Sequence, residues 1–553
     1  MCIKDVGKMA KTAYINGTIL SMVENMPAYT LLVEENGRIA ELGNAADFDA
    51  AAFDGTVVDL AGKTLMPGFM EVHGHSMQYA EYRLYVDITE EAGVTSIEDM
   101  QRVLREHLDT YGVSEGRFLI GNGYDNVFFP GGRHPNKYDL DAVSTEVPIV
   151  VLHISGHVGG ANSKALELLG YYDGCEDPNM GHLQRLEDGA SINGVLEGGA
   201  VYNEDVVEKF GKPTLAELAD SFIEVQKQYA SYGITTATEA WYTEEYARII
   251  QYMEEHDIKN LLEVMAYPYL DFADECLPAG TKQPTPYVKG FRCAGAKYSM
   301  DGSPQAKTAW LSKPYYVIPK GKPADYCGDP LRTDEEAIAF FDRCIKNGWS
   351  VHVHCNGDAA SEQFIRTYTQ AMKNNPDIDC SQLRPVMIHC QTVRTDQIER
   401  MKEIGMLASV FCDHIWYWGD WHYESVLGPE RANRISPLRE IADAGINYTL
   451  HQDPPICKPN MLFSVHNAVN RTTKGGRVLG EDQKLSVWEA LKGITINGAY
   501  QCFEEESKGT LEVGKIADLV VLDKNPLETD PTAIKDIKVL ETIKYGKVIY
   551  RAE

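Results

Sequence analysis

Eight short apolar runs in the central part of the chain constrain the fold more than any other feature. They read LMPGFMEVH, GITTATEAW, LLEVMAYPY, GFRCAGAKYSM, SVHVHC, RPVMIHC, MLASVFC and INYTLHQD. From the second run onward, most are separated by stretches such as TDEEAIAFFDRCIKNG, which have helical spacing and lie between a Thr cap and a closing Gly. Eight strand-helix repeats are typical of a (β/α)8 barrel, so we predict an α/β fold with a TIM-like barrel.

The two ends of the chain are similar to each other and differ from the centre. Both are rich in short β-like runs, and the runs AYINGTIL and YTLLVEENGRIAELG each contain an Asn-Gly pair, which favours a hairpin turn. We therefore predict that residues 1–62 and 505–553 pair into a small composite β-sandwich domain, while residues 63–504 form the barrel. Residues from about 77 to 212 interrupt the barrel rhythm with strand-like and helical pieces of their own, which predicts an inserted subdomain.

Charge and residue usage narrow the class of protein. A formal net charge of -29 would repel a nucleic-acid backbone, so we expect no nucleic-acid partner. No signal-peptide core and no apolar run of about 18 residues occurs, so we expect a cytoplasmic protein that does not span a membrane. The 12 cysteines include no CxxC pair and are expected to be thiols. The sequence leaves open whether the chain forms a homodimer.

Side chains able to bind metal or carry protons gather at the ends of these runs, where barrel enzymes place their chemistry. They are His73, His75, Lys297, His354, His389 and Asp453. The HxH pair alone would be most simply a coincidence, but the whole set is hard to explain as packing because buried charges are costly unless paired or metal-bound. Imidazole and carboxylate ligands predict one or two divalent ions, with zinc first and manganese or iron as alternatives.

The sequence leaves open two chemical states for Lys297, an ammonium group and a carbamate. As an ammonium group it would be repelled by a divalent cation, and it would then be a salt-bridged or surface side chain. After reaction with carbon dioxide it would instead be an anionic carbamate that can bridge two metals.

Other residues near the expected rim have a functional and a structural reading. The stretch DHIWYWGDWHYE after the seventh run is predicted to be a rim loop in which Trp416 and Trp418 form an aromatic wall for an apolar substrate group, or a lid packed on the insert. Asp301 either shapes the pocket or holds a turn, and the same choice applies to His157 in the insert. His352 is expected in the core or behind the metal ligands. The stretch SVWEALKGITINGAYQCF is expected to be one amphipathic helix that closes the barrel.

Several of these segments together carry a resemblance to a known family. PGFMEVHGH, AKYSMDGSP, HVHCNGDAA, VMIHCQ, YTLHQDPP and GTLEVGKIADLVVLDKNP resemble the amidohydrolase superfamily, in particular the amidohydrolase-3 family, which includes N-substituted formamide deformylases. The similarity covers nearly the whole chain, and the motifs occur in family order. Two segments depart from the family pattern: LHQ replaces a small Gly-Ser pair before Asp453, and HCNGD replaces a more apolar HAIGD, which puts substrate choice in question.

The resemblance implies a metal-dependent hydrolase of amide-type C–N bonds. His73 and His75 would bind one metal, His354 and His389 a second or shared one, and Lys297 would be the carbamate candidate. Asp453 would be both ligand and general base for a metal-activated water, and His354 or His389 would polarise the substrate oxygen if one metal is present.

Three functional hypotheses are therefore compared. The first is hydrolysis of an N-acyl or N-formyl small-molecule amide. The second is hydrolysis of a cyclic amide, lactone or amine on the same site. The third is a catalytically silent relative that binds a small molecule, a reading that the presence of Asp453 disfavours.

Overall fold

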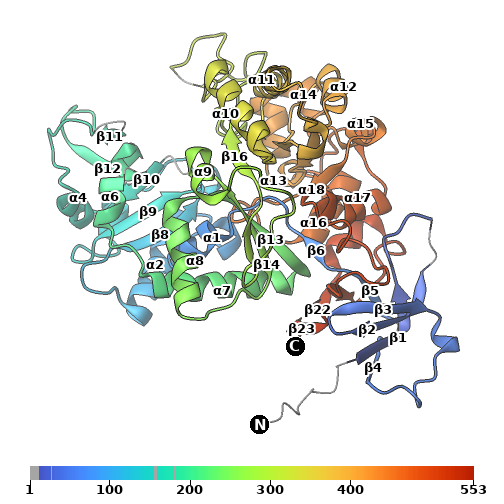
Figure 1. Cartoon of the computed structure of the whole chain (residues 1–553). Coiled ribbons are helices and arrows are strands. Elements are labelled where there is room, and N and C mark those ends of the chain that lie inside the picture. The colour runs from blue at the N-terminus through green and yellow to red at the C-terminus, as the bar shows by residue number, and fades with distance from the viewer. Residues whose placement is uncertain (1–10, 26–27, 155–157, 179–180, 203, 320) are drawn as a thin grey trace. The chain divides into compact units, whose positions relative to one another are not determined.

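The computed structural model describes residues 11–25, 28–154, 158–178, 181–202, 204–319 and 321–553. It is a mixed α/β structure (Figure 1). The chain divides into two compact units, one of residues 78–222 and one of residues 1–77 together with 223–553. Among the described residues, no helix is both long and apolar enough to cross a membrane.

All eight apolar runs form strands of the larger unit. They are β6 (Phe69–Met70), β13 (Ile234–Tyr242), β14 (Glu263–Pro268), β15 (Phe291–Cys293) with β16 (Ala296–Ser299), β17 (Val351–Cys355), β18 (Val386–His389), β19 (Leu407–Val410) and β20 (Tyr448–Leu450). They form two sheets, β6-β13-β14-β15 and β16-β17-β18-β19-β20, and within each sheet every strand pairs in parallel with its neighbour. Their carboxyl ends consequently share one edge, which is where the predicted site residues lie.

The two parallel sheets are joined at the fourth run. Ala294 and Gly295 separate β15 from β16, and a parallel bridge between Tyr269 and Lys297 connects the two sheets. Within the described residues no strand pairing joins β20 to β6. The α/β class is thus established, whereas closure into a barrel stays a prediction.

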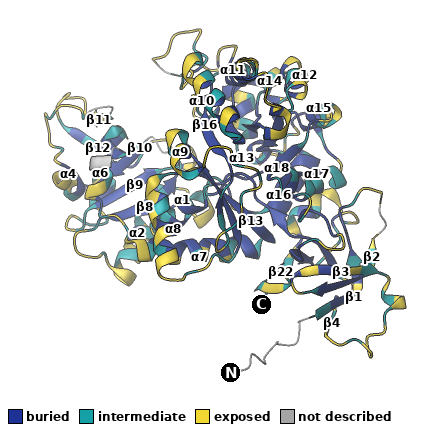
Figure 2. Ribbon diagram, in the orientation of Figure 1, coloured by how far each residue is buried: buried dark blue, intermediate teal, exposed yellow. Residues whose placement is uncertain are grey.

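Helices follow most of the parallel strands, with their apolar faces buried and their polar faces in water (Figure 2). They include α8 (Glu244–Glu255), α10 (Asp334–Asn347), α11 (Asp358–Asn374), α12 (Thr395–Glu403) and α15 (Leu438–Asp443). The α10 helix begins in a capping box between Thr333 and Glu336 and ends at Gly348, whose φ of 75° few other residues adopt. The cap and stop signals in the sequence therefore mark this helix correctly.

One predicted helix is wrong in length. The stretch expected to form a single closing helix forms α17 (Val487–Gly493) and α18 (Ile496–Gln501). The break falls at Thr495, whose φ of -131° and ψ of -100° lie outside the helical region. Its β-branched neighbours and internal glycines lower the helix propensity that amphipathic spacing alone suggests.

Strands from both ends of the chain join one mixed sheet, in the order β23-β22-β21-β5-β1-β2-β3, with β4 also paired to β1 (Figure 1). They are β1 (Lys11–Ile19), β2 (Tyr29–Glu35), β3 (Arg38–Gly43), β4 (Thr56–Asp59), β5 (Thr64–Pro67), β21 (Leu519–Leu522), β22 (Val539–Lys544) and β23 (Lys547–Arg551). Antiparallel pairing of β21 with β5 connects the two ends. Two-layered sandwich packing and the predicted domain bounds stay predictions.

Only one of the two Asn-Gly pairs forms a hairpin turn. Asn36 and Gly37, with φ of 56° and 79°, connect β2 to β3, as the sequence predicts. Asn16 and Gly17 instead lie within β1, where the register of pairing with β2 shifts between Ile15 and Ile19. Gly17 is needed there because a Cβ atom would lie 2.5 Å from the Lys63 carbonyl oxygen. The first hairpin prediction was wrong because a β-bulge uses the same residues as a turn.

The unit of residues 78–222 has a sheet of its own, ordered β11-β12-β10-β9-β8-β7. Its strands are β7 (Val86–Asp87), β8 (Leu119–Tyr124), β9 (Ile149–His153), β10 (Val158–Ala161), β11 (Gly181–Arg185) and β12 (Ile192–Gly198), with helices including α2 (Ile97–Tyr111) and α4 (Ser163–Leu169). Alternate residues of β9 pack into two separate apolar clusters, one containing Ile149 and Val151 and the other Val150 and Leu152. The central strand is therefore buried on both faces.

Candidate metal centre

The first histidine pair lies just beyond β6, and packing against the last strand holds it there. The His75 amide donates to the carbonyl of Pro454, with an N···O distance of 2.7 Å. A side chain at Gly74 would place a Cβ atom 2.8 Å from Cδ of Pro454, so this close approach requires glycine. The residues after β6 and β20, far apart in sequence, are thereby held side by side.

Three imidazoles converge on the carboxylate of Asp453. Its Oδ1 lies 3.2 Å from Nε2 of His75 and 3.6 Å from Nε2 of His73. Its Oδ2 lies 3.9 Å from Nε2 of His389. His73, His389 and Asp453 each offer a ligand atom within 4.8 Å of the others, and all three are buried. The structure thus brings together four of the six predicted residues around one point.

This donor set fits a divalent cation. The Asp453 Oδ1 atom is buried and has no contact of hydrogen-bond geometry among the described residues. Neutral imidazole nitrogens and a carboxylate oxygen are both electron-pair donors, so a shared cation or proton is needed between them. Nitrogen and oxygen ligands of this kind suit zinc and related ions.

Two positive φ angles occur at this centre. His389 has φ of 73° and Asp453 has φ of 56°, both in the left-handed region that residues other than glycine adopt rarely. Such strain persists only where the surrounding structure imposes it, and it is frequent at functional sites. His389 is the last residue of β18 and Asp453 follows the end of β20 by three residues, so both angles occur where the chain turns away from the sheet.

Electrostatics divide these groups into charged and neutral ones. Burial lowers the pKa of His73 and of His389 well below the ordinary value. Burial also lowers the pKa of His75, but Asp453 and Glu239 outweigh it and raise that pKa to about 9. Burial raises the pKa of Asp453, but His75 outweighs it and lowers that pKa to about 2. The carboxylate is therefore ionised at neutral pH.

Two buried glutamates that the sequence reasoning missed hold the histidine segment. Glu71 accepts hydrogen bonds from the amides of His73 and Gln452, at 3.1 and 3.2 Å. Glu239 accepts from the amides of Met77 and Trp241, and its Oε1 lies 3.8 Å from Nδ1 of His75. Glu71 lies two residues before His73, and that spacing was the available signal for it.

Lys297 reaches the cluster from β16. Only 2% of the residue is exposed, and Nζ lies 3.3 Å from Nε2 of His73. Burial lowers its pKa to about 8. The reading of Lys297 as a surface side chain is wrong, because its neighbours on β16 are buried and its side chain points toward the histidines.

A second set of contacts surrounds His389. Its Nδ1 lies 3.1 Å from Nε2 of His451, and Nδ1 of His451 lies 2.8 Å from Oγ of Ser409. All three residues are buried. Sequence reasoning quoted His451 only as a departure from the family pattern, and Ser409 carried no signal because it is an ordinary strand residue in the sequence.

His354 lies beside this group without being part of the cluster. Its ring centroid is 4.5 Å from that of His389. Its Nδ1 lies 3.3 Å from Oδ1 of Asp301 and its Nε2 lies 3.2 Å from Nδ2 of Asn356. Asp301 also accepts from the amides of Trp310, Asn356 and Gly357, so it holds a turn as well as facing His354.

The predicted aromatic rim loop is a helix, which is a correction. Residues 414–421 form α13 (His414–Trp421), continued by a π-helical turn (His422–Val426). Trp418 lies against His414, whose ring contacts Phe411, the neighbour of His389. Trp416 lies against Phe463, with the Lys535 ammonium over its ring. Residues two apart on a helix point about 200° apart, so the two tryptophans separate.

The remaining predicted residues lie elsewhere. His157 is outside the described residues. His352 is buried in the core and stacks on Tyr267, with ring centroids 3.8 Å apart. Cys355 and Cys390 are buried packing residues and free thiols.

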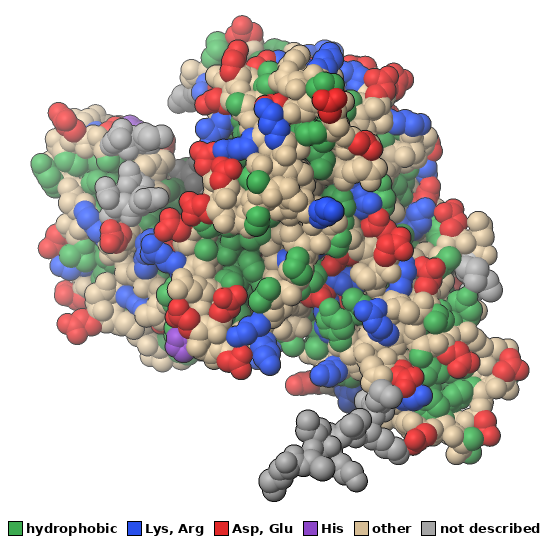
Figure 3. Space-filling view, in the orientation of Figure 1, with side chains coloured by type: hydrophobic (Ala, Val, Ile, Leu, Met, Phe, Trp, Pro, Cys, Tyr) green, Lys and Arg blue, Asp and Glu red, His purple; other side chains and the backbone are tan. Residues whose placement is uncertain are grey.

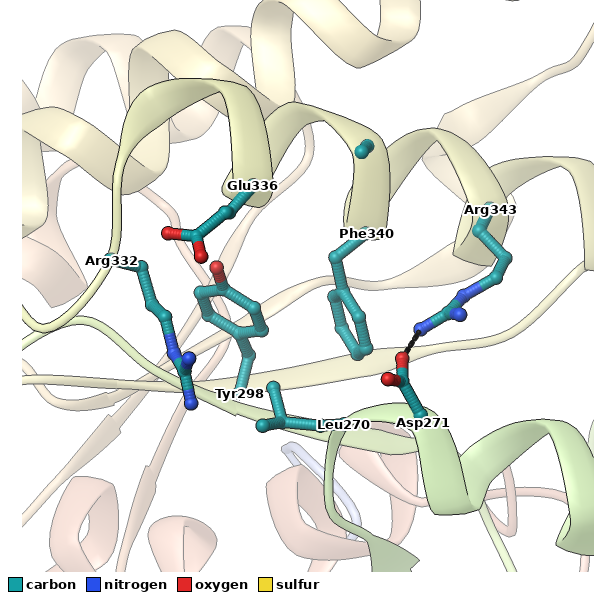
Figure 4. A pocket seen from close by; sticks show the side chains of 8 residues that line it. Leu270, Asp271, Tyr298, Arg332, Glu336, Phe340 and Arg343 are labelled. Carbon is teal, nitrogen blue, oxygen red and sulfur yellow. Dashed lines mark hydrogen bonds and ion pairs between the residues drawn. The ribbon is translucent and has the colours of Figure 1, made fainter.

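A surface pocket lies behind β16. Tyr298, Phe340 and Leu270 line it together with Arg332, Glu336, Arg343 and Asp271 (Figure 4). Lys297 and Tyr298 are neighbours on one strand and point to opposite faces, so this pocket is separate from the histidine cluster. On the face seen in Figure 3, acidic and basic side chains are interspersed.

Comparison with known proteins identifies the family. Residues 56–550 match the model of the Amidohydrolase family. The chain belongs to the amidohydrolase family. This amidohydrolase is 25% identical over 559 residues to Protein LONG AFTER FAR-RED 3 of Arabidopsis thaliana, covering 98% of this chain and 92% of that protein.

Two further proteins are similar to this chain over most of its length. The N-substituted formamide deformylase of Arthrobacter pascens is 24% identical over 561 residues, covering 98% of this chain and 99% of that protein. An uncharacterized metal-dependent hydrolase of Pyrococcus horikoshii OT3 superposes with a TM-score of 0.73 at 25% identity, covering 94% of this amidohydrolase and 99% of that chain. The predicted family is confirmed.

Proposed function

We propose that this amidohydrolase is a metal-dependent hydrolase that cleaves the amide-type C–N bond of a small N-acyl or N-formyl amide. The observation that carries the proposal is the convergence of His73, His75 and His389 on the ionised Asp453. A full-length relative named as an N-substituted formamide deformylase supports the choice of bond.

The residues that would hold the ion are His73, His75, His389 and Asp453, with zinc first and manganese or iron as alternatives, as one or two ions. When bound, such an ion supplies a Lewis acid that lowers the pKa of water to about 7 and polarises a carbonyl. We further propose that the amine of Lys297 adds to carbon dioxide and loses a proton to solvent, which turns a repelled ammonium into an anionic carbamate ligand.

Asp453 would carry the proton of the reaction. Its Oδ1 lies 3.2 Å from Nε2 of His75 and 3.6 Å from Nε2 of His73, so a water held among these groups would be within reach of the carboxylate and could give it a proton. It would return that proton to the nitrogen of the scissile bond, because an amide nitrogen is a poor leaving group until it is protonated. If only one metal is present, His354 or His389, whose rings lie side by side, would polarise the substrate oxygen.

Closure of the eight parallel strands into a barrel is part of the same proposal. The amide of Gln452, after β20, donates to Glu71, after β6. Together with the contact between His75 and Pro454, this bond supports a ring in which the first and last strands are neighbours. A closed ring would hold the metal ligands in a fixed arrangement.

The test is a hydrolysis screen over N-formyl, N-acetyl and longer N-acyl amines with zinc, manganese and iron. We expect turnover together with about one or two bound ions per chain. Fewer than about one bound ion per chain, with no turnover on any amide, would contradict the proposal and favour a silent binding protein.

Asp453→Asn tests the proton carrier. We expect kcat to fall by about 10²–10⁴, because a neutral amide cannot accept the proton. Circular dichroism should remain unchanged, and Asp396→Asn, at an exposed position on α12, is the matched control. Retained turnover in Asp453→Asn would remove this assignment.

A further inference from the structure

We propose that Ser409 and His451 form a hydrogen-bond relay that sets the tautomer and ring orientation of His389 for metal binding. The inference rests on the proposed function, since it concerns the same metal site. It assigns a positioning role to two residues that do not themselves face the Asp453 carboxylate as ligands.

The relay runs across three adjacent parallel strands. Ser409 lies on β19, His389 ends β18, and His451 follows β20. Oγ of Ser409 is 2.8 Å from Nδ1 of His451, and Nε2 of His451 is 3.1 Å from Nδ1 of His389. The far nitrogen of His389, Nε2, faces Asp453. The three side chains thus form one chain of contacts that ends at the cluster.

Packing keeps the middle imidazole in place. The His451 ring lies 5.0 Å from the His73 ring and 5.4 Å from the Phe411 ring, measured between centroids. Ser409 and His451 are both fully buried. Water cannot reach these side chains, so breaking either hydrogen bond would leave a buried polar atom unpaired and would lower stability.

Hydrogen-bond chemistry fixes the direction of the relay. A neutral imidazole has one donor nitrogen and one acceptor nitrogen. If Nε2 of His389 binds a cation, its proton must be on Nδ1, which then donates to Nε2 of His451. The proton of His451 is consequently on its Nδ1, where it donates to the Ser409 hydroxyl oxygen. The opposite direction would place a proton on Nε2 of His389 and block the cation.

This arrangement differs from that of the neighbouring His354. Nδ1 of His354 faces a carboxylate, that of Asp301, at 3.3 Å. A ligating histidine commonly donates its other N–H to a carboxylate or a carbonyl. At His389 the partner is a second imidazole, which can accept only when Ser409 holds it in the right tautomer. The Ser409 hydroxyl therefore acts on His389 through His451.

The experiment measures zinc affinity of the metal-free full-length protein by titration against a competing chelator. His451→Phe keeps a ring but removes the acceptor, and we expect zinc to bind about 10–100-fold more weakly. His451→Gln offers a side-chain oxygen near the position of Nε2, and we expect it to restore most of the affinity. The visible spectrum of the Co²⁺-loaded protein should change in His451→Phe and recover in His451→Gln.

The double variant separates a relay from two independent effects. Ser409→Ala should weaken zinc binding by itself, whereas adding it to His451→Phe should cause no further loss, because the Ser409 hydroxyl acts on His389 through His451. His466→Phe is the matched control: it removes a buried imidazole on α16 (Met461–Asn470) that stacks on Phe463, and zinc affinity should be unchanged.

The outcomes distinguish the relay from the proposed function. If the unaltered protein binds neither zinc nor manganese nor iron, the proposed metal site is wrong, and the relay is wrong with it. If the unaltered protein binds zinc and His451→Phe or Ser409→Ala binds it equally well, only the relay is overturned. Equal weakening in His451→Phe and His451→Gln would also overturn it. If His451→Phe does not fold, the other two variants still test the relay. The relay predicts weaker zinc binding in Ser409→Ala and nearly unchanged zinc binding in His451→Gln.

Discussion

Asp453 shows how neighbouring groups determine the state of a single side chain. Burial by itself raises the pKa of its carboxyl, yet His75, His451 and Lys297 together lower that pKa to about 2. Its φ of 56° occurs where the chain turns away from the sheet after β20. The carboxylate is consequently held charged and in place, the state that metal binding and proton transfer both require.

Lys297 allows a second test at the scale of one residue. Arginine keeps the positive charge but cannot form the carbamate, so Lys297→Arg should weaken metal binding by about tenfold or more. Removal of carbon dioxide from the buffer should lower the metal content of the unaltered protein, and bicarbonate should restore it. Unchanged metal occupancy in Lys297→Arg would mean that the lysine acts as an amine beside His73.

At the scale of elements, α13 assigns different roles to chemically identical side chains. Trp416 and Trp418 read as one aromatic wall in the sequence, but the helix directs them to different neighbours. Trp418 packs on His414, near Phe411 and the cluster, while Trp416 packs on Phe463. Only Trp418 therefore lies where it can meet a substrate bound beside His389.

We expect Trp418→Ala to raise KM for amides with large apolar acyl groups about tenfold, with little effect on a formyl amide, because an aromatic contact contributes about 0.5–1.5 kcal/mol beyond its buried area. Trp416→Ala is the matched control and should leave both KM values unchanged while it lowers stability. The measurement is kcat and KM over a series of acyl lengths. Equal effects from the two variants would contradict this assignment.

At the scale of the whole molecule, a buried ionic network connects the terminal sheet to the parallel strands. Glu263 on β14 contacts the ammonium groups of Lys508 and Lys544, and Lys544 also lies 2.6 Å from Asp518. Burial raises the pKa of Glu263, but Lys544 and Lys508 outweigh it and lower it to about 2. Glu263 is thus shared by two buried cations of the C-terminal segment, each of which has a second carboxylate partner, Glu504 for Lys508 and Asp518 for Lys544.

The network predicts a specific acid sensitivity. Because the folded-state pKa of Glu263 is below its unfolded value of about 4.5, its contribution to stability is present above that value and is lost as pH falls toward 2. Glu263→Gln should lower the free energy of unfolding at pH 7 by about 1.5–3 kcal/mol, since each buried lysine loses one of its two carboxylate partners. Denaturant unfolding at pH 7 and pH 4 measures both effects.

Glu541→Gln, on β22 next to an exposed arginine, is the matched control and should cost no more than about 1 kcal/mol. A loss of similar size in both variants, or an unchanged pH dependence in Glu263→Gln, would show that the network does not stabilise the fold.

The parallel strands and most of the cluster were predictable because their signals are local. Apolar runs indicate buried strands, and Thr and Gly indicate where helices begin and end. Histidines at the ends of strands indicate the edge that the parallel strands share. The errors came from residues whose local signal fits two structures. Asn16 and Gly17 suit a turn or a bulge, and the tryptophan-rich stretch suits a loop or a helix.

The sequence by itself determined which parallel strands form and that His73, His75, His389 and Asp453 lie at their shared edge, because periodicity and the parallel connection of successive strands carry that information. It did not determine that His354 lies outside the cluster, against Asp301. Only the tertiary structure decided the supporting groups: the Glu71 and Glu239 carboxylates that hold the histidine segment, and the Ser409 and His451 side chains behind His389. Their roles depend on contacts between residues as far as 381 positions apart, as in the bond between Gln452 and Glu71. Such contacts leave no periodic pattern in the chain.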